Sequence, residues 1–237
     1  MKKLKILAII TIIILVIFIA AAAALAYFGV FSFNLEDTPG IGNIILSPEE
    51  TKNPYEVPDD YEITAKIKTS AGEMVISLSD TSAAEKFISL SESGFFVGKE
   101  FSVLAENMFI QVKTEGEPFP SDKTDFSPIY GTVGFAMESD LASPSFFIIT
   151  NSSLSGISKA FIESGDFDAE KASLYLEKGG MPEYEGKVII FGKVISGMET
   201  AEKIASGENS GYTGGYSAKE PVIIESIEIT HTAPEQE

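Results

Sequence analysis

The chain has 237 residues, of which 44% are hydrophobic, a net charge of −18, and neither cysteine nor tryptophan. The lack of cysteine excludes disulfides, thiolate nucleophiles, cysteine-bound zinc and a lipid-modified lipoprotein cysteine. The acidic charge argues against a nucleic-acid partner, because binding to phosphates depends on Lys and Arg. The single histidine, His231, lies near the acidic end of the chain, so neither histidine-based catalysis nor a metal site is expected.

Residues 1–33 are predicted to form a membrane anchor. Three lysines lie in residues 1–5, and the apolar run from Ile6 to Val30 that follows them carries no charge. A helix of about 20 apolar residues crosses the hydrocarbon core of a bilayer, and flanking lysines stay in the cytoplasm. This interpretation makes the chain a single-pass membrane protein whose C-terminal domain is extracytoplasmic. The alternative is a cleavable signal peptide and secretion after cleavage near Ala26, since Ala24 to Ala26 form a small-x-small site.

Residues 34–60 are rich in Pro, Gly, Asp and Glu, which predicts a flexible linker. Alternating apolar residues begin at Tyr61, and we expect a folded domain over residues 61–231. Residues 232–237 form an acidic tail.

The folded domain is predicted to be mainly β. A hairpin is expected around Gly72, followed by a helix with Thr81 as its N-cap and Gly94 at its end. A helical pattern within residues 152–182, closed by Gly179-Gly180, predicts an insertion. The other predicted elements are strands at 131–137 and 146–149 with a loop containing Asp140, Ser143 and Pro144 between them, a strand at 188–194, a helix at 198–205, a loop at 207–221 and a strand at 222–230.

Several short sequence blocks, in this order, resemble the cyclophilin-type peptidyl-prolyl isomerases. They are GEMVISL from Gly72, NMFIQ from Asn107, GTVGFAM from Gly131, SFFI from Ser145, EGKVIIFGKVISGM from Glu185 and IESIEI from Ile224. The resemblance covers about residues 63–230 and implies a closed eight-stranded antiparallel barrel capped by two helices. It also implies a monomer that acts on proline-containing polypeptides of exported proteins without a cofactor.

The largest departure from this family lies at its catalytic arginine. In the family, an F-H-R-x motif places an arginine beside the bound proline, where the guanidinium donates a hydrogen bond to the prolyl nitrogen. The matching residues are Phe101, Ser102, Val103 and Leu104, so Val103 stands in place of the arginine. Lys113 lies two residues after Gln111 and is a possible substitute cation, although a solvated surface lysine is the alternative interpretation.

The family's proline pocket is partly retained. Its substrate-binding positions are matched by Met108, Phe109, Gln111, Ala136, Phe147 and Tyr184. Met137 replaces a family asparagine, and the family's W-L-D-G-x-H has become Glu183 to Val188, without its tryptophan and histidine. The apolar members of this set are also what an ordinary barrel core would contain.

The resemblance implies a membrane-tethered peptidyl-prolyl cis-trans isomerase that assists protein folding. Because Val103 replaces the arginine, its activity is expected to be weak. The alternative is a non-catalytic cyclophilin-like module that binds a peptide or a protein.

Overall fold

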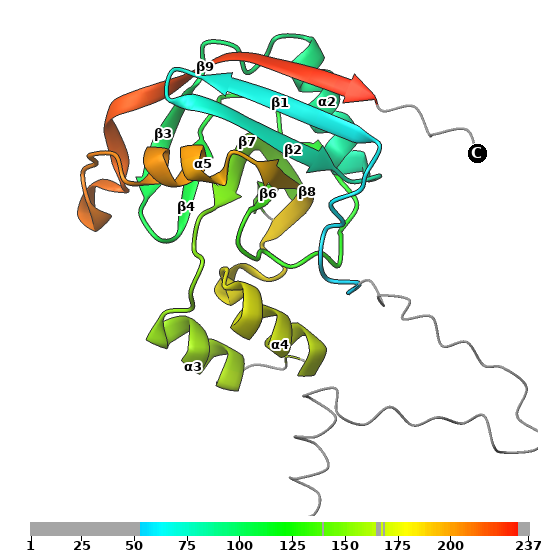
Figure 1. Cartoon of the computed structure of the whole chain (residues 1–237), viewed down its shortest axis with the longest axis vertical. Coiled ribbons are helices and arrows are strands. Elements are labelled where there is room, and N and C mark those ends of the chain that lie inside the picture. The colour runs from blue at the N-terminus through cyan, green and yellow to red at the C-terminus, as the bar shows by residue number, and fades with distance from the viewer. Residues whose placement is uncertain (1–52, 139, 165–166, 168, 232–237) are drawn as a thin grey trace, which may run out of the picture. The chain divides into compact units, whose positions relative to one another are not determined.

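The computed structural model describes residues 53–138, 140–164, 167 and 169–231 (Figure 1). The predicted anchor at 1–33, most of the predicted linker and the tail at 232–237 lie outside the described residues. Among the helices that are described, none combines the length and the apolar character needed to cross a bilayer.

Nine strands and four α-helices make up the described part of the chain. The strands are β1 (Ile63–Thr69), β2 (Gly72–Leu78), β3 (Glu100–Ala105), β4 (Phe109–Val112), β5 (Phe119–Pro120), β6 (Thr132–Glu138), β7 (Leu141–Ile149), β8 (Val188–Ser196) and β9 (Ser217–His231). The helices are α2 (Ser82–Glu92), α3 (Gly156–Ser164), α4 (Ala169–Lys178) and α5 (Met198–Ala205), with short 3-10 turns at Pro182–Tyr184 and Tyr212–Gly214.

The sheet closes on itself. Its strand order is β4-β3-β9-β1-β2-β8-β6-β7-β5, and a further pairing of β4 with β7 joins the ends of the first eight strands. Each of these pairings is antiparallel. The predicted closed eight-stranded antiparallel barrel is therefore confirmed, with β5 added on the outside of the ring along β7.

Local sequence signals account for the first hairpin and the first helix. β1 and β2 pair Ile67 with Met74, and both side chains are fully buried, as the alternation of apolar residues predicts. The hydroxyl of Thr81 accepts a hydrogen bond from the backbone N–H of Ala84 at 3.2 Å, which makes Thr81 the N-cap of α2.

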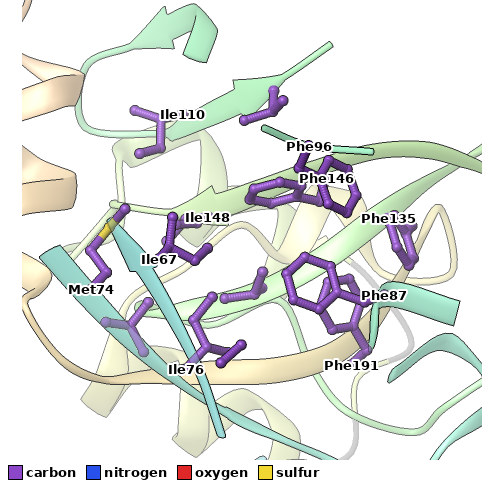
Figure 2. Packing of buried hydrophobic residues seen from close by; sticks show 14 of the residues in the cluster. Ile67, Met74, Ile76, Phe87, Phe96, Ile110, Phe135, Phe146, Ile148 and Phe191 are labelled. Atoms are coloured by element: carbon purple, nitrogen blue, oxygen red, sulfur yellow. The ribbon is translucent and has the colours of Figure 1, made fainter. Parts of the chain in front are cut away.

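Phenylalanine side chains dominate the barrel core (Figure 2). The ring of Phe87, on α2, stacks on Phe96 at 5.4 Å and on Phe191 at 4.9 Å between centroids, and meets the edge of Phe146 at 5.4 Å. α5 buries Ala201 and other apolar residues in the same core. Both helices therefore cap the barrel, as predicted.

Two strands begin earlier than predicted from the sequence. In both, a proline lies near the start of the strand, and proline is normally a signal against a strand. β7 starts at Leu141, so Ser143 and Pro144 lie in a strand and not in the predicted loop. β9 starts at Ser217 and includes Pro221. The strand pairing shifts register at both prolines, between the pairs Phe135–Phe146 and Met137–Ala142 and between Phe101–Val222 and Val103–Ser217. A bulge is where a strand accepts a proline, because no ladder hydrogen bond is lost there.

The chain packs against the barrel before residue 61, where the folded domain was predicted to begin. Val57 is only 1% exposed and belongs to the apolar cluster that contains Phe147. The Lys193 ammonium, on β8, binds the carboxylates of Glu56 at 3.0 Å and Asp59 at 2.8 Å. Val57 stands alone among polar residues and prolines, so it forms no periodic apolar pattern. The composition of the segment therefore predicted a linker and not a packed part of the domain.

Candidate functional site

A row of paired residues runs across four strands on one face of the barrel wall. Val103 on β3 pairs with Gln111 on β4, Gln111 pairs with Phe147 on β7, and Phe147 pairs with Gly134 on β6. Paired residues in antiparallel strands direct their side chains to the same face of the sheet. The strand register therefore brings the position of the family arginine alongside two of the predicted substrate-binding residues.

A cavity of about 220 Å³ opens along this row. It is lined by Phe109, Gln111, Ala136, Phe147, Ile149, Tyr184 and Val188. Five of these were named from the sequence, and the structure brings them together. Ile149 and Val188 were not named as site residues, although Val188 occupies the position of the family's missing histidine. An apolar cavity of this kind suits a small apolar ring.

Aromatic rings form the walls of the cavity. The ring of Phe109 lies 6.4 Å from that of Phe147, at an interplanar angle of 68°, and 6.1 Å from that of Tyr184, at 66°. Gly134 makes room for this arrangement, since a Cβ atom there would lie 2.9 Å from the Phe147 ring. Edge-to-face contacts hold each ring at a defined angle, so the cavity is largely preformed.

Two polar side chains at the cavity make no hydrogen bond to any described residue. Gln111 is half-buried, and its carboxamide offers both a donor and an acceptor. The hydroxyl of Tyr184 is likewise uncommitted; burial raises the pKa of Tyr184, and Glu183 and Tyr216 raise it further. Both groups can therefore hydrogen-bond to the backbone of a bound peptide.

None of the described residues that line this cavity carries a cationic side chain. Val103 is 9% exposed and belongs to none of the apolar core clusters. All 17 basic residues of the sequence are lysines, so no arginine elsewhere in the chain can take over. Lys113 is exposed and is not part of the lining; its backbone N–H donates to the Ser102 hydroxyl at 3.4 Å.

Met108 is the one predicted substrate-binding residue that does not line the cavity. It is half-buried and packs against the apolar cluster that contains the lining residues Phe147 and Ile149. Met108 lies in the turn before β4, and its N–H donates to the carbonyl of Ala105 at 3.0 Å. Its side chain therefore contributes to the apolar cluster around the cavity and not to the lining itself.

A carboxylate network that could not be predicted from the sequence anchors the turn carrying Tyr184. Glu185 accepts hydrogen bonds from the hydroxyls of Ser127 and Tyr175, each at 2.7 Å, and from the Lys171 ammonium at 3.3 Å. Tyr175, on α4, is fully buried, and its pKa is raised by burial and by Glu185. The helical insertion, in which α3 and α4 lie together beside the barrel (Figure 1), is thus fastened next to the cavity.

Comparisons with known proteins agree with this geometry. The model of the family "Cyclophilin type peptidyl-prolyl cis-trans isomerase/CLD" matches residues 64–229. A Staphylococcus saprophyticus protein named as a peptidyl-prolyl cis-trans isomerase is 26% identical over 162 residues, which are 61% of this chain and 82% of that protein. A Streptococcus pyogenes serotype M6 protein, named as a bifunctional phosphatase/peptidyl-prolyl cis-trans isomerase, is 28% identical over 185 residues, 69% of this chain and only 38% of that protein.

Solved structures show the same fold. A cyclophilin type peptidyl-prolyl cis-trans isomerase of Cryptosporidium parvum superposes with a TM-score of 0.54 at 20% identity, covering 73% of this chain and 100% of that one. Its crystal structure in the presence of the dipeptide Ala-Pro gives a TM-score of 0.52 at 19% identity, covering 72% and 99%. The barrel, its two capping helices and the matched residues 64–229 together show that this chain belongs to the cyclophilin-type peptidyl-prolyl cis-trans isomerase family.

Proposed function

We propose that this protein is a weak peptidyl-prolyl cis-trans isomerase that binds proline-containing segments of exported polypeptides. The observation that carries the proposal is the aromatic cavity beside Val103, with the uncommitted carboxamide of Gln111 in the same row. The Cryptosporidium parvum relative was crystallised in the presence of the dipeptide Ala-Pro, which supports a proline ring as the occupant. The protein is proposed to act as a monomer, as the family resemblance implies.

The mechanism follows from the electronic structure of the amide. Resonance creates a rotation barrier of about 18–20 kcal/mol, and the twisted amide has lost the charge-separated form that resonance provides. An apolar cavity disfavours the more polar planar state and so lowers the barrier to some degree. Gln111 and Tyr184 would hold the flanking backbone while the prolyl bond turns. No cofactor takes part.

The missing arginine limits the rate. Without it, none of the seven described lining residues can donate a charged hydrogen bond to the prolyl nitrogen and so withdraw its lone pair from resonance. Loss of one well-placed donor costs about 10²–10³ in rate. We therefore expect a rate on the order of a hundredfold or more below that of an arginine-bearing cyclophilin.

The non-catalytic binding module remains the second candidate, and the absence of arginine from the whole sequence favours it. Two-dimensional exchange NMR on an Ala-Pro peptide separates the two functions. Binding with accelerated cis-trans exchange supports the isomerase, and binding with the uncatalysed rate supports the module. A wild-type rate equal to that of an arginine-bearing cyclophilin on the same peptide would refute the weak-isomerase proposal.

Lys113→Ala is expected to leave the isomerase rate unchanged, because Lys113 does not line the cavity.

We propose that the folded domain lies outside the cytoplasmic membrane and that residues 1–33 tether it there. Support comes from the lysines at the start and the long apolar run after them. Extraction of membranes at alkaline pH tests the anchor, and protease treatment of intact cells tests the side. Release of a soluble protein with its N-terminus near Ala26 would favour the cleaved signal peptide instead.

A further inference from the structure

The loop before β9 lies beside the position of the family arginine. Ser217, the first residue of β9, pairs with Val103 on β3, and the backbone N–H of Leu104 donates to the carbonyl of Tyr216 at 2.9 Å. The side-chain amide of Asn209 donates to the carbonyl of Leu104 at 2.8 Å, and Figure 1 shows this loop, in orange, next to β3. The row of paired residues along the aromatic cavity therefore continues to Ser217, and Tyr216 directly precedes it.

Hydrogen bonds within the loop hold it in one conformation. The Ser210 hydroxyl donates to the Gly214 carbonyl at 2.8 Å and accepts from the N–H of Ser217 at 2.9 Å. The N–H of Tyr216 donates to the Gly211 carbonyl at 2.9 Å. Tyr216 has a φ of 55°, which bulky residues seldom adopt unless the surrounding structure imposes it. The place of Tyr216 is therefore fixed before any ligand binds.

The side chain of Tyr216 lies near that of Tyr184, which lines the aromatic cavity. Ser217 faces the same side of the sheet as Val103, because paired residues share a face, and the positive φ of Tyr216 breaks the alternation that would send its ring to the other side. Tyr216 raises the pKa of Tyr184, and charges more than about 10 Å apart are largely screened in salt. Since Tyr216 does not line the cavity, its ring lies at the rim.

The surface at this rim is aromatic and uncharged. Tyr212 is 82% exposed and Tyr216 is half-buried, and their rings lie 6.1 Å apart at an angle of 72°. Residues 209–218 carry no charge, and the charges that flank them, on Glu208 and Lys219, pair with each other at 3.1 Å. A charged ligand group would lose its hydration here without gaining a partner, so an apolar group is favoured.

We propose that Tyr216, with Tyr212 beside it, binds an aromatic side chain close to the proline that occupies the aromatic cavity. An extended peptide advances about 3.3 Å per residue, so a side chain one or two residues from the proline can reach the rim of the cavity. The inference rests on the proposed function and adds a substrate preference: proline segments with an aromatic neighbour.

The test measures the binding of matched peptides to the full purified chain by NMR. Each peptide has one proline in an alanine-rich background and one phenylalanine, placed one or two residues to either side; matched sets carry alanine or lysine in place of phenylalanine. We expect one phenylalanine peptide to bind roughly three- to tenfold more tightly than its alanine match, because contacts between aromatic rings add to the apolar area buried. Intermolecular NOEs should join its ring protons to those of Tyr216.

Variants of Tyr216 assign the preference to its ring. Tyr216→Gly removes the ring and suits the positive φ, so it should fold and reduce the phenylalanine preference to below about twofold. Tyr216→Phe keeps the ring and should retain the preference. Leu176→Ala, which removes an exposed apolar side chain on α4, is the control and should leave the preference intact. An unchanged preference in Tyr216→Gly would overturn the inference.

The remaining outcomes keep this inference separate from the proposed function. If phenylalanine and alanine peptides bind equally but both bind better than peptides without proline, the aromatic subsite is wrong and the proline site stands. If phenylalanine peptides with and without proline bind equally well, the proposed function fails; NOEs from the phenylalanine ring to Tyr216 then support the aromatic contact, and their absence overturns it. A lysine peptide that binds more tightly than its phenylalanine match would overturn the choice of an aromatic side chain.

Discussion

Replacing Val103 with arginine is expected to raise the isomerase rate by about a hundredfold. Val103 is paired with Gln111, and the Cβ atoms of such a pair lie about 5 Å apart, so the longer arginine side chain can extend over the cavity. There its guanidinium would donate to the prolyl nitrogen, as the family's arginine does, and one well-placed donor contributes about 10²–10³ in rate, or about 2.7–4 kcal/mol.

The fold should tolerate this change. Val103 is 9% exposed, so losing its burial costs about 1.5–3 kcal/mol, and the methylene stem of arginine replaces part of it. Exchange NMR on an Ala-Pro peptide measures the rate, with Val103→Met as a control that has length without a donor. If the Val103→Arg variant binds the peptide as well as the wild type does but isomerises it no faster, an arginine at position 103 does not reach the prolyl nitrogen.

Three further predictions concern stability and the shape of the site. Gly134→Ala should lower the free energy of unfolding by roughly 1–3 kcal/mol and weaken peptide binding, because the new Cβ would lie 2.7 Å from the Ile189 carbonyl oxygen and 2.9 Å from the Phe147 ring; urea titration and peptide titration measure the two effects. Tyr175→Phe should cost about 1–2 kcal/mol, because Glu185 loses a buried hydrogen bond, and calorimetry checks it. Above pH 10 the fold should lose stability: the pKa of Tyr175 is raised from 10.0, and that of Lys193 from 10.5, where burial lowers it but two carboxylates raise it more. The unfolded chain therefore releases these protons at a lower pH than the folded chain, so the urea midpoint should be flat below pH 10 and fall above it, and less steeply in Tyr175→Phe.

Much of the aromatic cavity could be predicted from the sequence. The blocks NMFIQ and SFFI fix which residues share a face once the strands are identified, because side chains alternate along a strand. Phe109, Gln111 and Phe147 were expected to lie together, and they line one cavity. Val188 was not predicted as a lining residue, because an apolar residue in an apolar strand gives no functional signal of its own.

The surroundings of the cavity could not be predicted in the same way. The hydrogen bonds that join Tyr175 to Glu185 link a helix to a turn, and no spacing rule relates the two positions. Val57 lies in a Pro-rich segment whose composition indicates a linker, yet its burial and the ion pairs of Lys193 with Glu56 and Asp59 hold the segment against the barrel. The starts of β7 and β9 could not be predicted, because Pro144 and Pro221 argue against a strand in the local sequence. Both prolines are accommodated at bulges, and a bulge depends on how the strands pair and not on local sequence.

The central claim is that the aromatic cavity holds a proline ring. Titration of the purified chain with an alanine-rich peptide containing one proline, and with the same peptide carrying alanine at that position, tests it most directly when followed by NMR. We expect the proline peptide alone to shift the signals of Phe109, Gln111 and Phe147, and Phe147→Ala to abolish the difference between the two peptides. Equal shifts with both peptides, or shifts confined to other parts of the barrel, would contradict it.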